Sequence, residues 1–209
     1  MPLLDLLRRD TLLPLVTVLL LQGCAPTPVR VETGDPGLIW EQRRHELEKI
    51  DGWRLKARIG IVAENDSGSA SLFWEQQDDR YSLKIVGPFG RGSLLVEGAL
   101  GEVTMRTGEG ETYTAQSAEE LIWRHTGWYI PVSDLQHWVL GLPAEAQGRE
   151  DYQLDDRGRI LRLESGQWTV EYQGYRPAGS EGGVALPDKL RLENPRLTIK
   201  LAVREWTLF

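Results

Sequence analysis

The sequence predicts a mainly β fold with a few helices: an unclosed antiparallel half-barrel of about 10–11 strands, covered by a helical lid. Three observations favour this fold. Apolar and polar residues alternate with a period of two over much of the chain beyond residue 52. Short turn sequences rich in Gly, Asn and Asp separate the alternating segments. Two segments with helical signals interrupt the series between residues 117 and 141.

Residues 1–23 are expected to form a removable export signal. Arg8 and Arg9 precede an apolar run at 12–21, which is shorter than the about 20 residues that span a bilayer. The run ends in Leu-Gln-Gly-Cys, which resembles the lipobox of bacterial lipoproteins. That resemblance implies that Cys24 receives a diacylglycerol and that its new amine is acylated after cleavage. The alternatives are an ordinary signal with a free cysteine and a short buried helix.

Residues 24–36 are expected to be the lipidated cysteine and a flexible tether, because they are rich in Pro, Thr and Gly and lack periodic apolar residues. In the sorting rule of such lipoproteins, aspartate after the cysteine retains the protein at the inner membrane. Alanine at position 25 therefore predicts that the protein is anchored at the periplasmic face of the outer membrane. Residues 37–209 are long enough for a single domain with its own core.

The first helix is expected to run from Pro36 to Lys49, with Asp35 as its N-cap. From Trp53 to Ile61 the odd positions are apolar and the even ones are basic or glycine, which predicts a strand with one buried face. Less regular alternation predicts five further short strands before residue 116, at Ser69–Gln76, Arg80–Val86, Ser93–Glu97, Val103–Thr107 and Thr112–Ala115.

The middle of the chain predicts the lid. A capping box beginning at Ser117 opens a helix that Gly127 closes, and a second helix starts near Pro131 and ends near Gly141. A long loop is expected from Tyr175 to Pro187 because it is rich in Gly and Pro. The remaining segments with strand character are Tyr152–Leu154, Ile160–Glu164, Gln167–Gln173, Lys189–Glu193 and Arg196–Trp206.

The composition excludes several function classes. A net charge of −7 disfavours binding to nucleic acid, and a single cysteine excludes internal disulfides and multi-cysteine metal sites. His45, His125 and His137 lack partners at metal-ligand spacing, and no nucleophile elbow, phosphate loop or dinucleotide fingerprint occurs. We therefore expect no enzyme, catalytic residue, metal or cofactor. A pair of glycosidase carboxylates remains open, since such pairs are spatial.

Two features of the chain allow more than one interpretation. Pro88, Phe89 and Gly90 lie in a Gly- and Pro-rich loop between two predicted strands. Phe89 is either an exposed apolar finger for a membrane or partner, or a ring folded back onto its own hairpin. The eight tryptophans are by default core residues, although indole rings also suit a wall that is partly apolar and partly polar. A cavity between the lid and the sheet would offer such a wall.

The chain resembles the outer-membrane lipoprotein family LolB. The resemblance is most specific in the Gly-x-x-Ile-Pro link at 127–131, the Leu-x-x-Trp helix at 135–138 and the Gly-Leu-Pro exit at 141–143. It extends over essentially the whole mature chain, through Phe73-Trp74-Glu75-Gln76, Asp79-Arg80-Tyr81, the Pro-x-Gly loop at 88–90 and Tyr152-Gln-Leu-Asp155.

The resemblance implies a receptor that accepts acylated lipoproteins from the periplasmic carrier LolA and inserts them into the outer membrane without nucleotide. It implies that Trp74, Trp138 and Trp168 line an acyl-chain cavity and that Cys24 is the lipid anchor. Phe89 stands where the family's protruding loop usually has leucine, so its apolar character is kept. We expect a monomer. The alternatives from other classes are an envelope-polymer hydrolase and a structural lipoprotein with a filled core.

Overall fold

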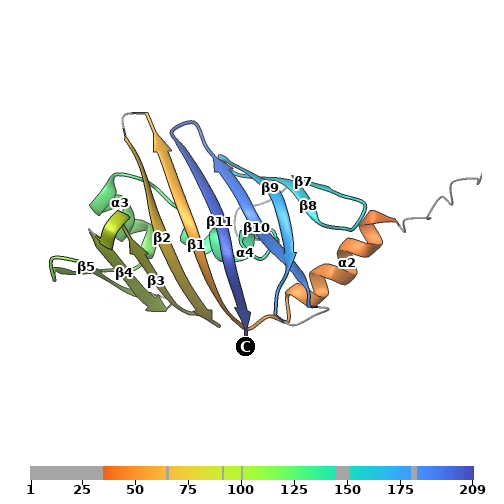
Figure 1. Cartoon of the computed structure of the whole chain (residues 1–209), viewed down its shortest axis with the longest axis horizontal. Coiled ribbons are helices and arrows are strands. Elements are labelled where there is room, and N and C mark those ends of the chain that lie inside the picture. The colour runs from red at the N-terminus through yellow and green to blue at the C-terminus, as the bar shows by residue number, and fades with distance from the viewer. Residues whose placement is uncertain (1–34, 65, 91, 100, 145–150, 180–182) are drawn as a thin grey trace, which may run out of the picture. The chain divides into compact units, whose positions relative to one another are not determined.

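One antiparallel sheet organises the part of the chain that the computed structural model describes, which is residues 35–64, 66–90, 92–99, 101–144, 151–179 and 183–209. Eleven strands follow one another in the order β6-β5-β4-β3-β2-β1-β11-β10-β9-β8-β7 (Figure 1). Within the described residues, the end strands β6 and β7 do not pair with each other, so the sheet is open. The predicted signal peptide, Cys24 and residues 25–34 of the predicted tether lie outside the described residues.

The strands confirm the expected series, with small differences at their ends. Those of the first half are β1 (Gly52–Ala63), β2 (Ser67–Gln77), β3 (Arg80–Val86), β4 (Ser93–Ala99), β5 (Glu102–Thr107) and β6 (Thr112–Ala115). Those of the second half are β7 (Asp151–Leu154), β8 (Ile160–Ser165), β9 (Trp168–Pro177), β10 (Ala185–Glu193) and β11 (Leu197–Leu208). Strands β1 and β11 pair over most of their length and join the two halves.

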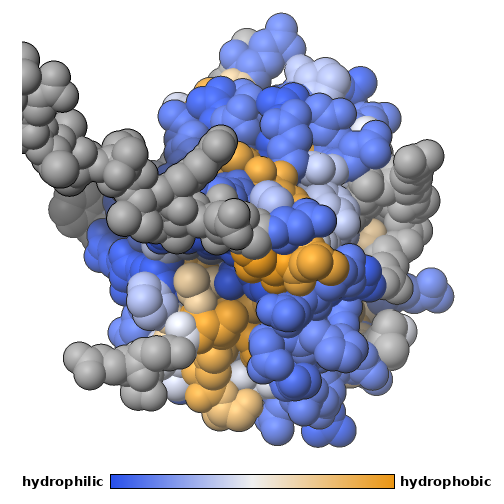
Figure 2. All heavy atoms as spheres, turned by 90° about the vertical axis from the view of Figure 1, so that its right-hand side faces the viewer, coloured by the Kyte–Doolittle hydropathy of each residue, from blue (hydrophilic) through white to orange (hydrophobic). Residues whose placement is uncertain are grey.

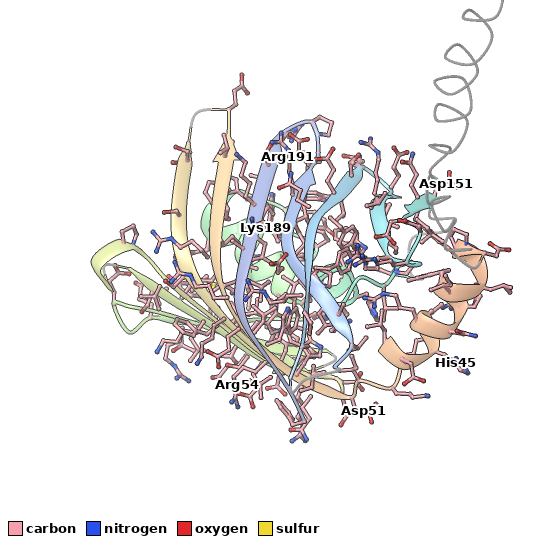
Figure 3. The ribbon with its side chains drawn as sticks, turned by 45° about the vertical axis from the view of Figure 1, so that its right-hand side comes forward. His45, Asp51, Arg54, Asp151, Lys189 and Arg191 are labelled. Atoms are coloured by element: carbon pink, nitrogen blue, oxygen red, sulfur yellow. The ribbon has the colours of Figure 1, made fainter. Side chains whose placement is uncertain are left out.

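The alternation in β1 decides which face of the sheet is buried. Leu55 and Ile59 point inward, whereas Arg54 and Lys56 lie on the exposed outer face. On that face Arg54 pairs with Glu75 at 2.8 Å and Lys56 pairs with Glu205 at 2.9 Å. Figure 3 shows the same charged outer face on β10, where Lys189 and Arg191 are labelled. Exposed pairs of this kind contribute at most about 1 kcal/mol each, so the buried inner face stabilises the fold.

Three helices form where the capping signals predicted them: α2 (Pro36–Leu47), α3 (Ala118–Thr126) and α4 (Val132–Trp138). The Asp35 Oδ1 accepts from the Gly37 N–H at 2.9 Å, and the Ser117 Oγ accepts from the Glu120 N–H at 3.2 Å. Gly127 ends α3 in the left-handed conformation, with φ 75°. The predicted caps therefore set the start of α2 and both ends of α3. Helix α4 follows Pro131 without a side-chain cap and ends at Trp138, a little before the predicted end near Gly141.

Helices α3 and α4 cover the inner face of the sheet (Figure 1). Trp138 at the end of α4 is fully buried, and the Tyr172 hydroxyl of β9 donates to the Trp138 carbonyl at 3.1 Å. Near the N-terminal end of β1, the ring centroid of Trp53 lies 5.1 Å from that of Trp74 and 5.5 Å from that of Trp206. The predicted open half-barrel with a helical cover is thus confirmed.

Helix α2 packs beside the edge strand β7 through one aromatic contact. The Trp40 Nε1–H donates to the Tyr152 hydroxyl at 3.0 Å, and the two rings lie 5.4 Å apart. Figure 2 views the molecule from this side and shows a surface that is mainly hydrophilic, with hydrophobic atoms in a few groups. The β7–β8 turn approaches α2 closely, because a Cβ on Gly158 would lie 2.6 Å from the Trp40 backbone nitrogen.

Replacing Gly158 with alanine is expected to destabilise the protein more than replacing Gly110 does. Both glycines have positive φ, at 63° and 89°, so both variants lose about 1–2 kcal/mol through backbone strain. A Cβ on Gly110 meets no atom within 4 Å, whereas one on Gly158 must push α2 away, for about 1–3 kcal/mol more. Urea unfolding of the two variants measures this difference, and equal losses would contradict the close approach.

The expected long loop from Tyr175 to Pro187 is wrong. Strand β9 continues to Pro177 and β10 begins at Ala185, so the connection is much shorter. Pro187 opposes Tyr175 where the register shifts, which is an irregularity of the kind that tolerates proline. Gly174 makes room for the irregularity, because a Cβ there would lie 2.3 Å from the Asp188 Oδ1. The Gly and Pro residues of this segment suggested a loop, but Gly174 and Pro187 instead lie at the irregularity in the pairing of β9 with β10.

Candidate functional site

Two hollows open at one end of the sheet, where the β1–β2, β3–β4, β8–β9 and β10–β11 turns lie. The first, called the apolar hollow here, has a volume of about 380 Å³. The second, called the polar hollow, has a volume of about 700 Å³. Both volumes fall in the range of small-ligand sites, about 300–1,000 Å³. The link between α3 and α4, residues 127–131, contributes to the walls of both.

The apolar hollow is bounded by the sheet on one side and the lid on the other. Ile59, Ile85 and Leu94 face it from β1, β3 and β4, at positions that the strand alternation directs inward. Ile122 of α3 and Ile130 of the link face it from the lid. Hydroxyl and imidazole groups stand among these apolar walls, on Ser69, Ser93, Thr107, His125 and Thr126.

The loop predicted as an apolar finger lies at the apolar hollow, since Gly87 and Gly92 both line it. The Gly87 N–H donates to the Gly92 carbonyl at 3.0 Å, and Pro88–Gly90 forms a single 3-10 turn between them. Gly92 has φ 68°, a conformation that glycine adopts without strain. The backbone of Phe89 is therefore in a tight turn, while its side chain lies outside the described part. The choice between a finger and a folded-back ring stays a prediction.

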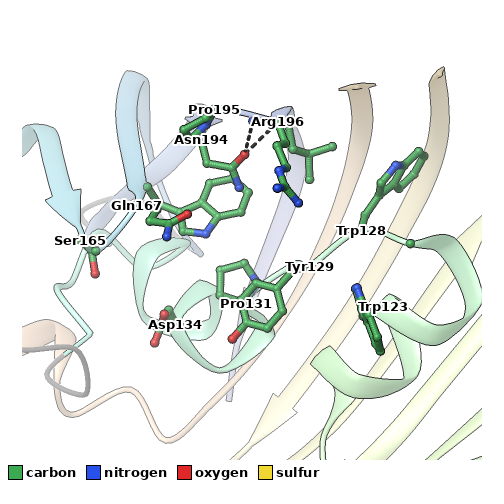
Figure 4. A pocket seen from close by; sticks show the side chains of 14 residues that line it. Trp123, Trp128, Tyr129, Pro131, Asp134, Ser165, Gln167, Asn194, Pro195 and Arg196 are labelled. Atoms are coloured by element: carbon green, nitrogen blue, oxygen red, sulfur yellow. Dashed lines mark hydrogen bonds between the residues drawn. The ribbon is translucent and has the colours of Figure 1, made fainter. Parts of the chain in front are cut away.

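The polar hollow lies on the other side of the link. Asn194, Pro195 and Arg196 of the β10–β11 turn face Tyr129 and Pro131 across it (Figure 4). The Asn194 Oδ1 accepts from the backbone N–H groups of Arg196 and Leu197, both at 2.8 Å, which fixes this turn. Further walls come from the lid and the β8–β9 turn, through Trp123, Trp128, Asp134, Ser165, Gln167 and Trp168.

The structure does not bring the three predicted cavity tryptophans to one place. The rings of Trp138 and Trp168 lie 6.5 Å apart, and Trp168 lines the polar hollow. Trp74 borders a smaller hollow of about 140 Å³ beside Gln76 and the N-terminal end of α3. Trp138 lines none of these three hollows, and its buried Nε1–H has no hydrogen-bond partner among the described residues. Their contact with acyl chains therefore stays a prediction.

The ring that lines both hollows, Trp128, was not singled out from the sequence. It lies in the α3–α4 link, where no periodicity assigns a direction to a side chain. The one available signal was its place inside the Gly-x-x-Ile-Pro segment. Trp123 of α3 is an exception to the default expectation that the tryptophans are core residues. It is 56% exposed, because Leu121 and Ile122 occupy the buried face of that short helix.

Asp134 in α4 is the buried carboxylate of the site. It is 7% exposed and lines the polar hollow. Burial raises its pKa above the ordinary value, the neighbouring Glu119 raises it further, and His137 acts in the opposite direction. Glu119 itself joins the two lid helices, because its Oε1 accepts from the Ser133 N–H at 2.7 Å and from the Ser133 hydroxyl at 2.8 Å.

The Asp134→Asn variant is expected to be more stable than the parent at neutral pH. A carboxyl with a raised pKa in the folded state binds its proton more readily there than in the unfolded chain, so ionisation costs stability as pH rises. Asparagine removes that cost, and the advantage should fade as pH falls below 3.8, the ordinary value for Asp. Unfolding curves between about pH 3 and pH 7 measure it. A constant difference across that range would contradict the assignment.

The described residues contain no group of three or more His, Cys, Asp and Glu side chains placed to hold a metal ion. No helix among them is both long enough and apolar enough to cross a membrane.

Comparisons with known proteins identify relatives over most of the chain. The profile of the family "Outer membrane lipoprotein LolB" matches residues 51–206. An outer-membrane lipoprotein LolB of Nitrosococcus oceani is 36% identical over 194 residues, covering 93% of this chain and 95% of the relative. That of Pseudomonas syringae is 36% identical over 192 residues, covering 90% and 91%.

Solved structures share the fold at low sequence identity. A LolA superfamily protein from Nitrosomonas europaea aligns with a TM-score of 0.55 at 10% identity, covering 83% of this chain and 93% of that one. A DUF1329 family protein from Desulfovibrio piger aligns with a TM-score of 0.53 at 10% identity, over the same shares of the two chains. These likenesses support the architecture alone.

Proposed function

Because the chain belongs to the outer-membrane lipoprotein family LolB, we propose that it is a lipid-anchored receptor that accepts lipoproteins from the periplasmic carrier LolA and inserts them into the outer membrane. Its clients are acylated lipoproteins, and it acts as a monomer without cofactor or catalytic residue. The single observation that supports this role best is the apolar hollow between the sheet and the lid.

The physical need for such a hollow follows from the client. Each methylene group that enters water costs about 0.8 kcal/mol, so acyl chains cannot cross the periplasm exposed. Walls built from Ile85, Leu94 and Ile130 keep hydrocarbon away from water. The polar groups beside them make part of the wall hydrophilic. This limits how tightly acyl chains are held and favours their onward release.

Delivery without nucleotide requires that each step run downhill. The receptor must bind the client more tightly than the carrier does, and the bilayer must bind it more tightly than the receptor. A lipid on Cys24 keeps the receptor at the destination membrane, where several acyl chains hold almost irreversibly. The Pro88–Gly90 turn beside the apolar hollow would then bring Phe89 to the bilayer near the bound chains.

A carrier-to-receptor transfer assay tests the proposal. Protein lacking residues 1–24 is mixed with LolA loaded with an acylated lipoprotein, and the client is then followed by affinity capture. We expect the client to move to the receptor without nucleotide. Retention of the client on the carrier under all conditions would contradict the function.

Placing a charge in the apolar hollow is expected to stop acceptance. In the Ile85→Asp variant, a carboxylate must lose its water when an acyl chain enters, so client transfer should fall at least about tenfold. Lys84→Asp is the matched control, because the neighbouring residue is exposed on the opposite face of β3. Circular dichroism of both variants checks that they are folded. Normal transfer by Ile85→Asp would show that acyl chains bind elsewhere.

A further inference from the structure

We propose that the polar hollow binds the polar end of the client: the glyceryl group, the N-acylated cysteine and the first peptide units. This inference rests on the proposed function, in which the acyl chains occupy the apolar hollow. It assigns a second subsite, with a different chemistry, to the hollow bounded by the β8–β9 and β10–β11 turns and the lid.

The two hollows are placed to share one ligand. Trp128 lines both of them, so the two spaces adjoin at this side chain of the link. On this link Ile130 lines the apolar hollow, whereas its neighbours Tyr129 and Pro131 line the polar one. A ligand with an apolar and a polar end can therefore place one end on each side of Trp128.

The walls of the polar hollow are rich in hydrogen-bond donors. Ser165 lines this hollow, and its buried hydroxyl has no hydrogen-bond partner among the described residues, so an acceptor on a ligand that reached it would satisfy it. The Asn194 Oδ1 is already engaged by two backbone N–H groups, which leaves its NH₂ as the end of the amide to serve a ligand. The Gln167 amide and the Arg196 guanidinium add further donors (Figure 4).

This donor set matches the head of a triacylated lipoprotein. That head presents ester and amide carbonyl oxygens, all of them acceptors, and its amine is acylated and therefore uncharged. An acyl chain would bury these donors without partners, which is unfavourable. The Asp134 carboxylate in the same hollow repels an anionic headgroup. A neutral ligand rich in acceptors is thus the class that the walls favour.

Photolabelling of the full-length, lipid-anchored protein in liposomes tests the assignment directly. Two synthetic triacylated lipopeptides are used, one with a diazirine at the end of an acyl chain and one with a diazirine on the second amino acid. We expect the acyl probe to label the walls of the apolar hollow, such as Ile85 and Leu94. The peptide probe should label Gln167 and Arg196.

The outcomes separate this inference from the proposed function. If the acyl probe labels the apolar hollow but the peptide probe does not label the polar one, the subsite is refuted and the function stands. If the acyl probe labels neither hollow, the proposed function fails, and the subsite fails with it. Labelling of the polar hollow by the acyl probe would also overturn the assignment.

Variants supply a second measurement in the same liposomes. Unlabelled lipopeptide and palmitate each compete with the acyl probe, and the concentration for half-competition is compared between variant and parent. For Ser165→Ala, the concentration of lipopeptide for half-competition should rise about fivefold, because one hydrogen bond is lost. The corresponding concentration of palmitate should not change. Gln167→Leu should have the same effect. Gln153→Leu, at an exposed position on β7, should change the half-competition concentration of neither competitor. Equal changes for both competitors would refute the subsite.

Discussion

Replacing Phe89 with glutamate is expected to leave client acceptance intact and to block delivery into liposomes. The hydrogen bond between Gly87 and Gly92 closes the loop at its base, so residue 89 can change without altering the register of β3 and β4. Moving an acidic side chain into a bilayer in place of an apolar one costs about 3 kcal/mol at the centre and less near the surface. Delivery should therefore slow by about tenfold or more.

Two controls isolate the loop in this experiment. Phe89→Leu keeps an apolar side chain and should deliver clients at a rate close to that of the parent. Leu161→Glu places the same charge at an exposed apolar position on β8 and should also deliver normally. Transfer from LolA and release into liposomes are measured separately for each variant. Equal release by Phe89→Glu and the parent would refute a membrane role for Phe89.

The order of strands and helices was predictable from the sequence because it depends on local signals. Alternation sets the buried face of each strand, as in β1, and capping residues such as Ser117 and Gly127 set the ends of α3. The segment from Tyr175 to Pro187 was misjudged for the same reason. Its Gly and Pro residues act on a bulged pair of strands, and that pairing depends on contacts far along the chain.

The residues that line the candidate site were less predictable, because they depend on how the lid and the sheet pack against each other. Alternation predicts that Trp74 faces inward, but not that Trp53 and a separate small hollow are its neighbours. The role of Trp128 arises only once the lid is laid over the sheet. The unpartnered hydroxyl of Ser165 is likewise invisible in a turn sequence, since it reflects what surrounds the turn.

The lid must move for a client to enter, and fastening it to the sheet is expected to abolish acceptance. Around forty methylene groups of a triacylated client, each taken to be about as bulky as a water molecule at roughly 30 Å³, need on the order of 1,200 Å³. The apolar hollow holds about 380 Å³. Trp138 of α4 is fully buried and its carbonyl accepts from Tyr172, whereas α3 and the link line the apolar hollow, so we expect α3 and the link to move outward.

A chemical bridge between α3 and β6 tests this movement. The rings of His125 and Tyr113 lie 6.0 Å apart, so cysteines at these positions can be joined by a short bismaleimide. The chain has a single cysteine, Cys24, so protein lacking residues 1–24 offers no other thiol. The bridged variant should accept less than about a tenth as much client as the same variant capped with separate maleimides.

The matched control bridges two cysteines on the outer face, at Lys56 and Glu205, whose side chains meet at 2.9 Å. That bridge joins β1 to β11, which are already paired, so it restrains no part of the lid and acceptance should be normal. Unhindered acceptance by the His125–Tyr113 bridge would mean that the chains enter without displacing α3. The hollow would then have to widen through the sheet turns, and the Gly87–Gly92 loop would be the next segment to restrain.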